Sequence, residues 1–375
     1  MGRFIGFDAH KSYAYVVELR DGEKQEYRVS IPSGLPQFKE RLDKSVQLVL
    51  EASTNSFRLA DELSPHVGKL VVADPSQTRG AASTAAVTDR TAAEALARLL
   101  ASDFVRPVWI PPQDIRDLRN LVELRVKLAR MRVGATNRLK ALLRQELVAT
   151  GPGRARLVEE TVKQLIGQSP TQQTYCSALF RMRDQVEEES KKVDVVLTEW
   201  SRKSNEARLI MSIPGIGPIV AACVLAQVGD IKRFSSAAKL CSYAGLIPKV
   251  HQSGQTRRSG SITRKGRRSL RWAMGLAAMS ACRVDGQVKI FKQNLTERRP
   301  KAVAMTACAR KLLALVWHVW SSGKPFLDSK NEETKEQDQK RHDIKLRNLD
   351  RQPREKRDAP SSTRKKNKGP SVEGS

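Results

Sequence analysis

Three short apolar segments near the start of the chain each end on an acidic residue, and no other feature restricts the fold as strongly. The segments are residues 3–8, 45–51 and 69–74, which end at Asp8, Glu51 and Asp74. A fourth apolar segment, residues 12–19, follows the first one after a tight turn. Short apolar segments that alternate with helix-like patterns are typical of an α/β sheet. Since side chains at strand ends converge in the crevice beyond such a sheet, the acids are predicted to gather there.

Carboxylates that crowd together repel one another unless a cation neutralises them, so Asp8 and Glu51 indicate a Mg²⁺ or Mn²⁺ site. Residues 87–100 have a helical pattern that begins with Thr88 and Asp89, which places a third carboxylate over the site. One acid at a strand end is more often a turn or capping residue. The combination of three acids is what favours a metal site.

Composition divides the chain into four regions. Residues 1–112 alternate strand-like and helix-like patterns, 113–211 form long helices, 212–326 contain glycine turns and helices, and 327–375 lose apolar periodicity. The predicted fold class is therefore α/β plus α: a mixed sheet with helices, a long helical middle and a mainly α C-terminal domain. Residues 329–375 hold 14 Lys and Arg and 9 Asp and Glu but few aliphatic residues, which predicts that the last region is a disordered basic tail.

The helical middle has apolar residues at three- and four-residue spacing, and its other face is basic. Gly151-Pro152-Gly153 separates two such segments. This pattern predicts either an antiparallel helical hairpin or coiled coil, or plain core helices.

The 67 Lys and Arg against 40 Asp and Glu give a formal net charge of +27, which indicates a polyanionic partner, nucleic acid before an anionic membrane surface. Between Asp230 and Asp285 there are 12 basic residues and no acid. Aromatic residues make up only 5% of the chain, so binding is expected to depend on backbone charge more than on base stacking. The candidate nucleic-acid-binding residues are Lys249, Arg257, Arg258, Arg264, Lys265, Arg267, Arg268, Arg125, Lys127 and Arg132.

The cellular location is predicted from the lack of membrane-spanning and secretory patterns in the sequence. No apolar stretch reaches the roughly 20 residues that span a bilayer, and an acid at position 8 interrupts any secretory signal. The five cysteines contain no C-x-x-C pair and are expected to be buried, reduced thiols. A cytoplasmic protein without a membrane partner is therefore expected, associated with the nucleoid when bound to DNA.

The order I-G-F-D, L-E-A-S and T-D-R-x-x-A-x-x-L-A-x-L-L over residues 5–100 resembles the DEDD domain of the insertion-sequence-110 family of transposases. The resemblance implies an RNase H-type, RuvC-like fold, in which Asp8, Glu51 and Asp89 match the first three acids of the metal-binding tetrad. The fourth position, residue 92, is Ala where the family has Asp. Three explanations are open: an engineered inactivating substitution, a natural degenerate copy, or rescue by a nearby acid such as Glu94 or Asp74.

The C-terminal part resembles the transposase domain of the same family. Ala244-Gly245-Leu246-Ile247-Pro248, Ser253-Gly254, Lys265-Gly266 and Leu270-Arg271 follow the family's order and spacing. The resemblance implies that Ser253 is the nucleophile, and basic residues around it could neutralise charge that develops in phosphoryl transfer. Ser259 and Ser261 are the rival nucleophiles, and a serine that only turns a loop is the plain alternative. Upstream, Gly215-Ile216-Gly217 could approach a phosphate or form a packing corner between helices.

By this resemblance, which covers about residues 1–325, the chain is a bacterial site-specific recombinase of an insertion sequence. It would form a transient phosphoserine link at Ser253, assisted by a Mg²⁺ or Mn²⁺ site. The implied partners are double-stranded donor and target DNA, a non-coding bridge RNA and further copies of the chain in a dimer or tetramer. The alternatives are a Holliday-junction resolvase-like metal nuclease, in which Ser253 is incidental, and a catalytically impaired nucleic-acid-binding form due to Ala92.

Overall fold

The computed structural model describes residues 2–76, 88–148, 162–164, 169–253, 256–284, 286–327 and 332–351. The chain divides into two compact units, residues 1–113 and 114–375, which are treated separately below. Gly151-Pro152-Gly153, predicted to separate the two long helices, lies outside the described residues.

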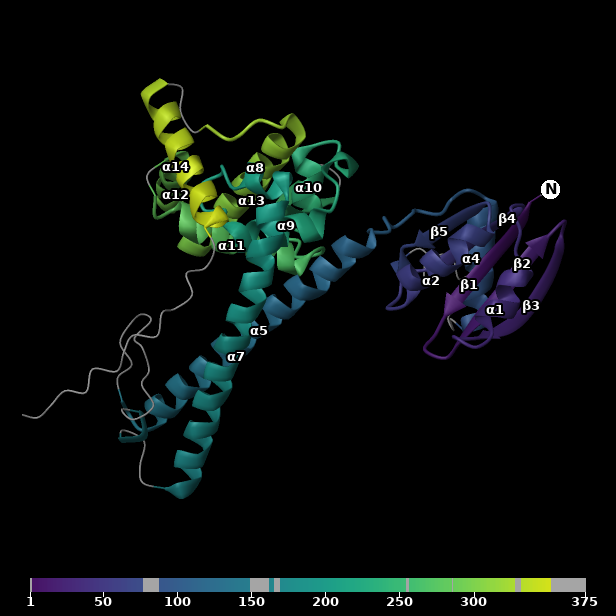
Figure 1. Ribbon diagram of the computed structural model, residues 1–375, viewed down its shortest axis with the longest axis horizontal. Coiled ribbons are helices and arrows are strands. Elements are labelled where there is room, and N and C mark those ends of the chain that lie inside the picture. Colours follow the sequence, from purple (N-terminus) through teal and green to yellow (C-terminus); the bar gives the residue numbers. More distant parts are fainter. Residues whose placement is uncertain are drawn as a thin grey trace, which may run out of the picture. The chain divides into compact units, whose positions relative to one another are not determined.

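The first unit is a five-stranded mixed sheet with helices on both faces (Figure 1). Its elements are β1 (Arg3–Ala9), β2 (Tyr13–Arg20), β3 (Glu23–Ser30), α1 (Leu35–Glu40), β4 (Val46–Glu51), α2 (Ser56–Leu63), η1 (Ser64–His66), β5 (Lys69–Ala73) and α4 (Asp89–Ala101). The strand order is β3-β2-β1-β4-β5; β1 is parallel to β4 and β4 to β5, whereas β2 and β3 are antiparallel neighbours. This sheet is consistent with the expected RNase H-like fold.

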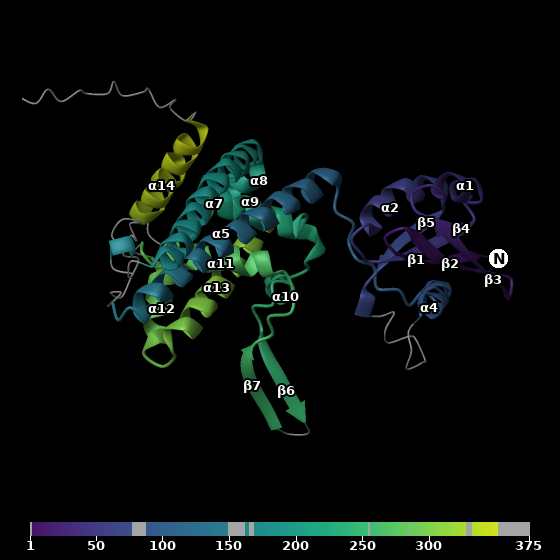
Figure 2. The same ribbon diagram turned by 90° about the horizontal axis from the view of Figure 1, so that it is seen from below.

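Strand alternation sends side chains of each strand to two different cores. Ile5, Phe7, Leu48 and Leu50 pack with α1 and α2, whereas Val49 and Val17 lie on the opposite face and pack with α4. Figure 2 shows α1 and α2 on one side of the sheet and α4 on the other. Asp8 follows Phe7 and Glu51 follows Leu50, and both Phe7 and Leu50 face α1 and α2. Because successive residues of a strand point to opposite faces, Asp8 and Glu51 face the side that carries α4.

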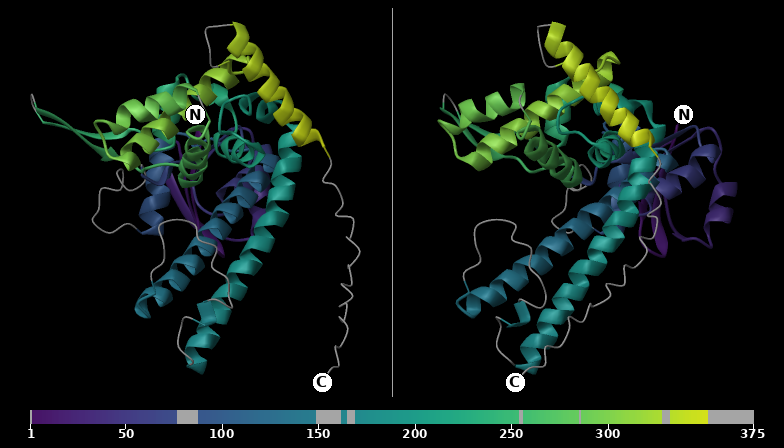
Figure 3. Two further views of the ribbon diagram at one scale, coloured as in Figure 1. Left: turned by 90° about the vertical axis from the view of Figure 1, so that its left-hand side faces the viewer. Right: turned by 60° about the vertical axis from the view of Figure 1, so that its left-hand side comes forward.

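The second unit begins with two long helices, α5 (Gln113–Gln145) and α7 (Pro170–Lys203), which lie side by side and antiparallel (Figures 1 and 3). Polar contacts connect them along their length, with Arg125 bound to Asp194, Arg132 to Glu187 and Glu146 to Gln172. Leu139, Leu143, Cys176, Leu179 and Phe180 form a separate core between the two helices far from the remainder of the unit. The antiparallel hairpin is therefore the correct one of the two predicted arrangements.

The rest of the second unit is a helical body with one two-stranded hairpin. Its elements are α8 (Asn205–Ile210), α9 (Pro218–Val228), η2 (Ile231–Arg233), α10 (Ala237–Tyr243), β6 (Pro248–Ser253), β7 (Thr256–Ile262), α11 (Arg268–Ala281), α12 (Gln287–Thr296), α13 (Lys301–Ser322) and α14 (Glu332–Asp350). Leu118 and Val122 of α5 and Val193 and Leu197 of α7 share one core with α9, α11 and α13. The boundary expected at residues 211 and 212 therefore does not separate two compact units.

Helix α13 is long and apolar enough to cross a membrane by length and composition alone. It packs against α10, α11 and α12, and Leu312, Leu313 and Val316 are fully buried in the shared core. Among the described residues α13 is the one helix that meets this test, and its packing is that of a core helix.

The prediction of disorder from residue 327 onward is wrong for residues 332–350, which form α14. Arg208 donates to both carboxylate oxygens of Asp350 at 2.6 and 3.0 Å, and Lys345 donates to the carbonyl oxygen of Met211 at 2.9 Å. Leu349 and His342 are buried. Specific polar bonds thus hold a helix whose composition is that of a solvated tail; residues 352–375 lie outside the described part.

Candidate functional site

The acidic site of the first unit begins with two neighbouring parallel strands. Phe7 of β1 pairs with Leu50 of β4, so Asp8 and Glu51 are the next residues at the carboxyl ends of these strands. Both face the α4 side of the sheet, by the alternation described above. Parallel pairing therefore places Asp8 and Glu51 on neighbouring strands, although the Glu51 carboxylate is outside the group of ligand atoms that lie within 4.8 Å of one another in the described part of the chain.

A glycine brings the third carboxylate close. A Cβ atom on Gly6 would lie 2.0 Å from the carbonyl oxygen of Ala93 and 2.7 Å from the backbone nitrogen of Ala97, so α4 touches the bare backbone of β1. Thr88 caps α4, since its side chain accepts from the Thr91 backbone N–H. Asp89, the first residue of the helix, consequently lies over the end of β1, where the positive end of the helix dipole favours a negative charge.

Asp89 and Asp8 share a neighbour that the sequence analysis did not select. Nε2 of His10 lies 3.2 Å from Oδ1 of Asp89 and 3.5 Å from Oδ2 of Asp8. The hydroxyl of Tyr13 donates to the other oxygen of Asp89, at 2.6 Å. One ligand atom each from Asp8, His10 and Asp89 lies within 4.8 Å of the others.

Burial and the neighbouring negative charges disfavour the ionised form of Asp8, a cost that a bound cation would offset. Burial raises the pKa of Asp8 to about 6; His10 lowers this pKa, and the negative charges of Glu51 and Asp89 raise it. Oxygen ligands held together against their mutual repulsion are the donor set that divalent cations prefer. Asp8 and Asp89 could hold such a cation, whereas Glu51, the third predicted acid, is outside the cluster and acts on Asp8 only through its charge.

The position of the missing fourth acid is now defined. Ala92 is 6% exposed and lies three residues after Asp89, so both are on the same face of α4. Glu94 does not replace the acid: its carboxylate binds Lys24 at 3.0 Å and Arg98 at 2.7 Å, which accounts for the lowered pKa of this group. Asp74 follows β5 and accepts a hydrogen bond from the Ser76 backbone.

Ser253 ends strand β6, at the tip of the β6–β7 hairpin. The hairpin projects from the helical body (Figures 2 and 3), and the Ser253 backbone pairs with Thr256. The side chains of residues 250–259, including Ser253, His251, Arg257, Arg258 and Ser259, lie outside the described residues, as do Gly254 and Gln255 entirely. Ser261 lies on β7 and is exposed.

Gly245 and Gly266, from the A-G-L and K-G motifs, allow close backbone contacts at the base of this hairpin. Gly245 has φ +67° and a Cβ there would lie 2.2 Å from the carbonyl oxygen of Lys265; Gly266 has φ +115° and approaches the Tyr243 carbonyl equally closely. Arg271 donates to the Ala244 carbonyl at 2.7 Å. The A-G-L and K-G motifs therefore touch each other and fix where the serine hairpin leaves the body.

The predicted nucleic-acid-binding residues differ in what they contact. Lys127, Lys249, Arg264, Lys265 and Arg268 are exposed. Arg267 donates to the Tyr243 hydroxyl at 2.8 Å. Arg125 binds both oxygens of Asp194 at 2.6 and 3.1 Å, and Arg132 lies 3.5 Å from Glu187, so these two hold the α5–α7 pair together.

The glycine turn before α9 is a packing corner. Gly215 has φ +83°, and a Cβ atom there would lie 2.2 Å from the Ala277 carbonyl oxygen of α11. The backbone of α11 therefore packs directly against the turn at Gly215. Of the two interpretations left open by the sequence, the structural one explains Gly215.

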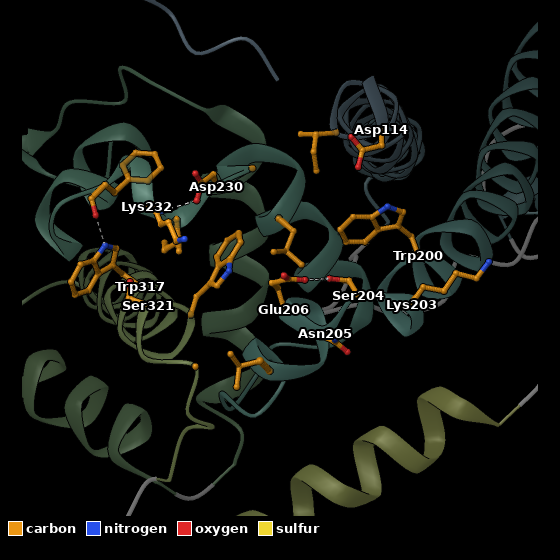
Figure 4. A pocket seen from close by; sticks show the side chains of 18 residues that line it. Asp114, Trp200, Lys203, Ser204, Asn205, Glu206, Asp230, Lys232, Trp317 and Ser321 are labelled. Carbon is orange, nitrogen blue, oxygen red and sulfur yellow. Dashed lines mark hydrogen bonds between the residues drawn. The ribbon is translucent and has the colours of Figure 1, made fainter. Parts of the chain in front are cut away.

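A separate pocket of about 1270 Å³ lies in the helical body (Figure 4). Trp200, Trp317 and Trp320 line it together with both acids and lysines, and the indole N–H of Trp317 donates to the Phe234 carbonyl. Two of its three acids serve local structure, since Asp230 accepts from the Lys232 backbone and Glu206 from the Ser204 hydroxyl. The pocket contains none of the predicted site residues.

His10 and Tyr13 are the site residues that sequence reasoning missed. The signal was present, because the tight turn predicted between the first two strands contains His10 and ends next to Tyr13. The turn closes through a bond from the His10 backbone N–H to the Tyr13 carbonyl at 2.8 Å. A residue two positions after a strand-end acid, in a turn that tight, returns to the same edge of the sheet.

Comparison with known proteins gives two family matches and several relatives. Residues 5–147 match the DEDD domain of IS110 transposases, and residues 207–293 match the transposase domain of the IS116/IS110/IS902 family. The y4pF/y4sB protein of Sinorhizobium fredii, whose name assigns it to the transposases, is 27% identical over 341 residues, 86% of this chain and 85% of its own. The transposase for insertion sequence element IS1111A of Coxiella burnetii is 25% identical over 61% of this chain and 65% of its own. The pilin gene-inverting protein of Moraxella bovis is 35% identical over 33% of this chain and 39% of its own.

Proposed function

Because the chain belongs to the IS116/IS110/IS902 family of transposases, enzymes that cut and rejoin DNA, we propose that it recombines the DNA of an insertion sequence through a serine nucleophile. Ser253 is the proposed nucleophile, and Asp8, Glu51 and Asp89 are the proposed ligands of a Mg²⁺ or Mn²⁺ ion. The observation that carries the proposal is the convergence of Asp8 and Asp89 from separate elements onto one point.

The proposed reaction exchanges one phosphodiester bond for another. The Ser253 hydroxyl loses its proton and its oxygen bonds to phosphorus, while a deoxyribose oxygen leaves with the electron pair and takes up a proton. Attack by a different deoxyribose hydroxyl then releases the serine and rejoins the DNA. The bound cation would neutralise charge on the phosphate oxygens.

The basic residues have a corresponding role. Lys249, Arg264, Lys265 and Arg268 are exposed and lie at or beside the base of the hairpin that carries Ser253. We assign them, with Arg257, Arg258 and Arg267, to the backbone of DNA or of a bridge RNA that pairs with donor and target. Recovery of one defined RNA with the purified protein would support the role of a bridge RNA. Recovery of only random cellular RNA would remove the main support for that role.

Ser253→Ala tests the nucleophile. We expect loss of a covalent protein–DNA adduct and of strand exchange, because alanine has no hydroxyl to form the phosphoester. Adduct formation is measured by denaturing electrophoresis of labelled DNA, with Ser261→Ala as the matched control on the neighbouring strand. Metal-dependent cleavage that persists in Ser253→Ala without an adduct would instead favour the resolvase-like nuclease.

Ala92→Asp tests the third alternative, a binding protein without catalysis. An aspartate at this position adds a carboxylate on the face of α4 that carries Asp89, so we expect tighter Mg²⁺ binding and faster strand exchange. Calorimetry measures the first and a recombination assay the second. Tighter metal binding without any strand exchange, in wild type or variant, would favour the binding-only form.

A further inference from the structure

We infer that His10 is a metal ligand of this site, and that its nitrogen shifts the preference of the site toward transition cations over Mg²⁺. The inference rests on the proposed metal site but adds to it a residue outside the carboxylate set.

The ring nitrogen is placed as a ligand atom would be. Nε2 of His10 is shielded from solvent, although the whole side chain is 39% exposed, and it lies within ion-pair distance of two carboxylates, 3.2 Å from Asp89 and 3.5 Å from Asp8. With metal–ligand bonds of about 2.1 Å, neighbouring ligand atoms lie roughly 3.0 Å apart in an octahedron and about 3.4 Å apart in a tetrahedron. The two observed separations are close to these edges.

The surroundings hold the ring in this position. The His10 backbone N–H donates to the Tyr13 carbonyl at 2.8 Å, and the His10 carbonyl accepts from the Asn55 side chain at 3.1 Å. The imidazole packs on the Tyr13 ring with centroids 4.9 Å apart. Tyr13 also occupies Oδ2 of Asp89, which leaves Oδ1 facing His10. Backbone and ring contacts together orient Nε2 toward the carboxylates of Asp8 and Asp89.

The donor set then has consequences for metal choice. Imidazole nitrogen suits transition cations such as Zn²⁺, Fe²⁺ and Ni²⁺ better than it suits Mn²⁺, whereas Mg²⁺ strongly prefers oxygen ligands and keeps its waters. Ala92 removes an oxygen donor from the family's tetrad, and His10 supplies a nitrogen donor near Asp89. The site of this chain thus offers a nitrogen donor, whereas a set of four carboxylates would offer only oxygen donors.

The test is Mn²⁺ binding by the full-length protein, followed by pulsed electron paramagnetic resonance for coupling between the ion and ¹⁴N. We expect nitrogen coupling in the wild type, its loss in His10→Ala and in His10→Gln, and at least about a tenfold weaker Mn²⁺ affinity with little change for Mg²⁺. His66→Ala, an exposed histidine of the same unit, is the control that keeps the signal. Circular dichroism checks that the variants remain folded.

The possible failures are distinguishable. Mn²⁺ that binds with unchanged affinity and without nitrogen coupling in the wild type overturns the role of His10 and leaves the carboxylate site intact. Absence of Mn²⁺ and Mg²⁺ binding in the wild type overturns both the inference and the proposed metal site. Nitrogen coupling that survives in His10→Ala means that another ligand supplies it, which also overturns the inference.

Discussion

The acidic site depends on one residue that has no side chain. Gly6 allows the backbone of α4 to contact β1, and this contact determines how far Asp89 lies from Asp8. The nearest atoms are backbone atoms of Ala93 and Ala97, which cannot rotate away as a flexible side chain would. Gly6 is therefore a positioning residue for the site, although it contacts no ligand.

Gly6→Ala should displace α4 and separate Asp89 from Asp8. We expect a loss of about 1–3 kcal/mol of stability from overpacking and a weaker affinity for Mn²⁺. Thermal unfolding and calorimetric titration measure the two effects.

Gly134→Ala is the control for this change, because a Cβ atom at Gly134 of α5 meets nothing within 4 Å. That variant should be neutral or stabilising by about 0.5–1 kcal/mol, as expected for alanine in a helix. Unchanged stability and metal binding in Gly6→Ala would show that α4 can move without cost.

The sequence could predict Asp8, Glu51 and Asp89 because each follows a recognisable strand or begins a recognisable helix. It could not decide between Glu94 and Asp74 as substitutes for the missing acid. The ion pairs of Glu94 with Lys24 and Arg98 arise from β3 and from the next turn of α4. Such pairings depend on which face of α4 meets the sheet, and that packing is a tertiary property.

At the scale of elements, β3 and α14 are two of the segments that sequence reasoning missed, and both are polar. Strand β3 has only Val29 buried, so it lacks the alternation that indicates a strand; its pairing with β2 defines it. Helix α14 has little apolar periodicity, and its attachment depends on bonds from Arg202, Arg208 and Lys345. Hydrogen-bond partners distant in sequence leave no local pattern.

The attachment of α14 should weaken in mild acid. Burial lowers the pKa of His342, and the nearby charges of Lys345 and Arg208 lower it further, whereas Asp343 opposes them. Below the ordinary histidine pKa of about 6.5, the detached helix binds a proton that the attached helix does not, so attachment loses free energy as the pH falls. Amide hydrogen exchange across residues 332–350, corrected for intrinsic rates, measures the effect.

His342→Gln provides the comparison, because glutamine does not titrate in this range. The variant should lose the pH dependence above pH 5, where Asp350, with its pKa lowered by Arg208, remains charged. An equal pH response in wild type and variant would mean that another group controls the attachment.

At the scale of the whole molecule, the formal charge of +27 overstates what is available to nucleic acid. Arg125 is held by Asp194 between two helices, whereas Lys127, two residues away, is exposed. Position along the chain cannot separate these two roles. A basic side chain that is paired with a carboxylate within the protein is not available to replace a counterion on a phosphate, whereas an exposed one is.

This difference predicts the salt dependence of DNA binding. Lys127→Ala should reduce the slope of log K against log salt by about 0.9 if Lys127 contacts a phosphate of duplex DNA. Arg125→Ala should leave the slope unchanged, because Arg125 does not exchange counterions while bound to Asp194. Fluorescence anisotropy with a short duplex over a salt series measures both; equal slopes for Lys127→Ala and wild type would exclude Lys127 from the contact.

The antiparallel pair of helices α5 and α7 forms a helical arm, and the pairing of its side chains would allow its length to change by whole heptads. The step from Arg125 to Arg132 on one helix equals the step from Asp194 to Glu187 on the other, and each is one heptad. Seven residues are close to two helical turns, so removing one heptad from each helix shortens the arm by roughly 10 Å and keeps the facing side chains in phase. Reach can therefore change in relatives of this protein by matched insertions or deletions, while the helical body at the base of the arm stays the same.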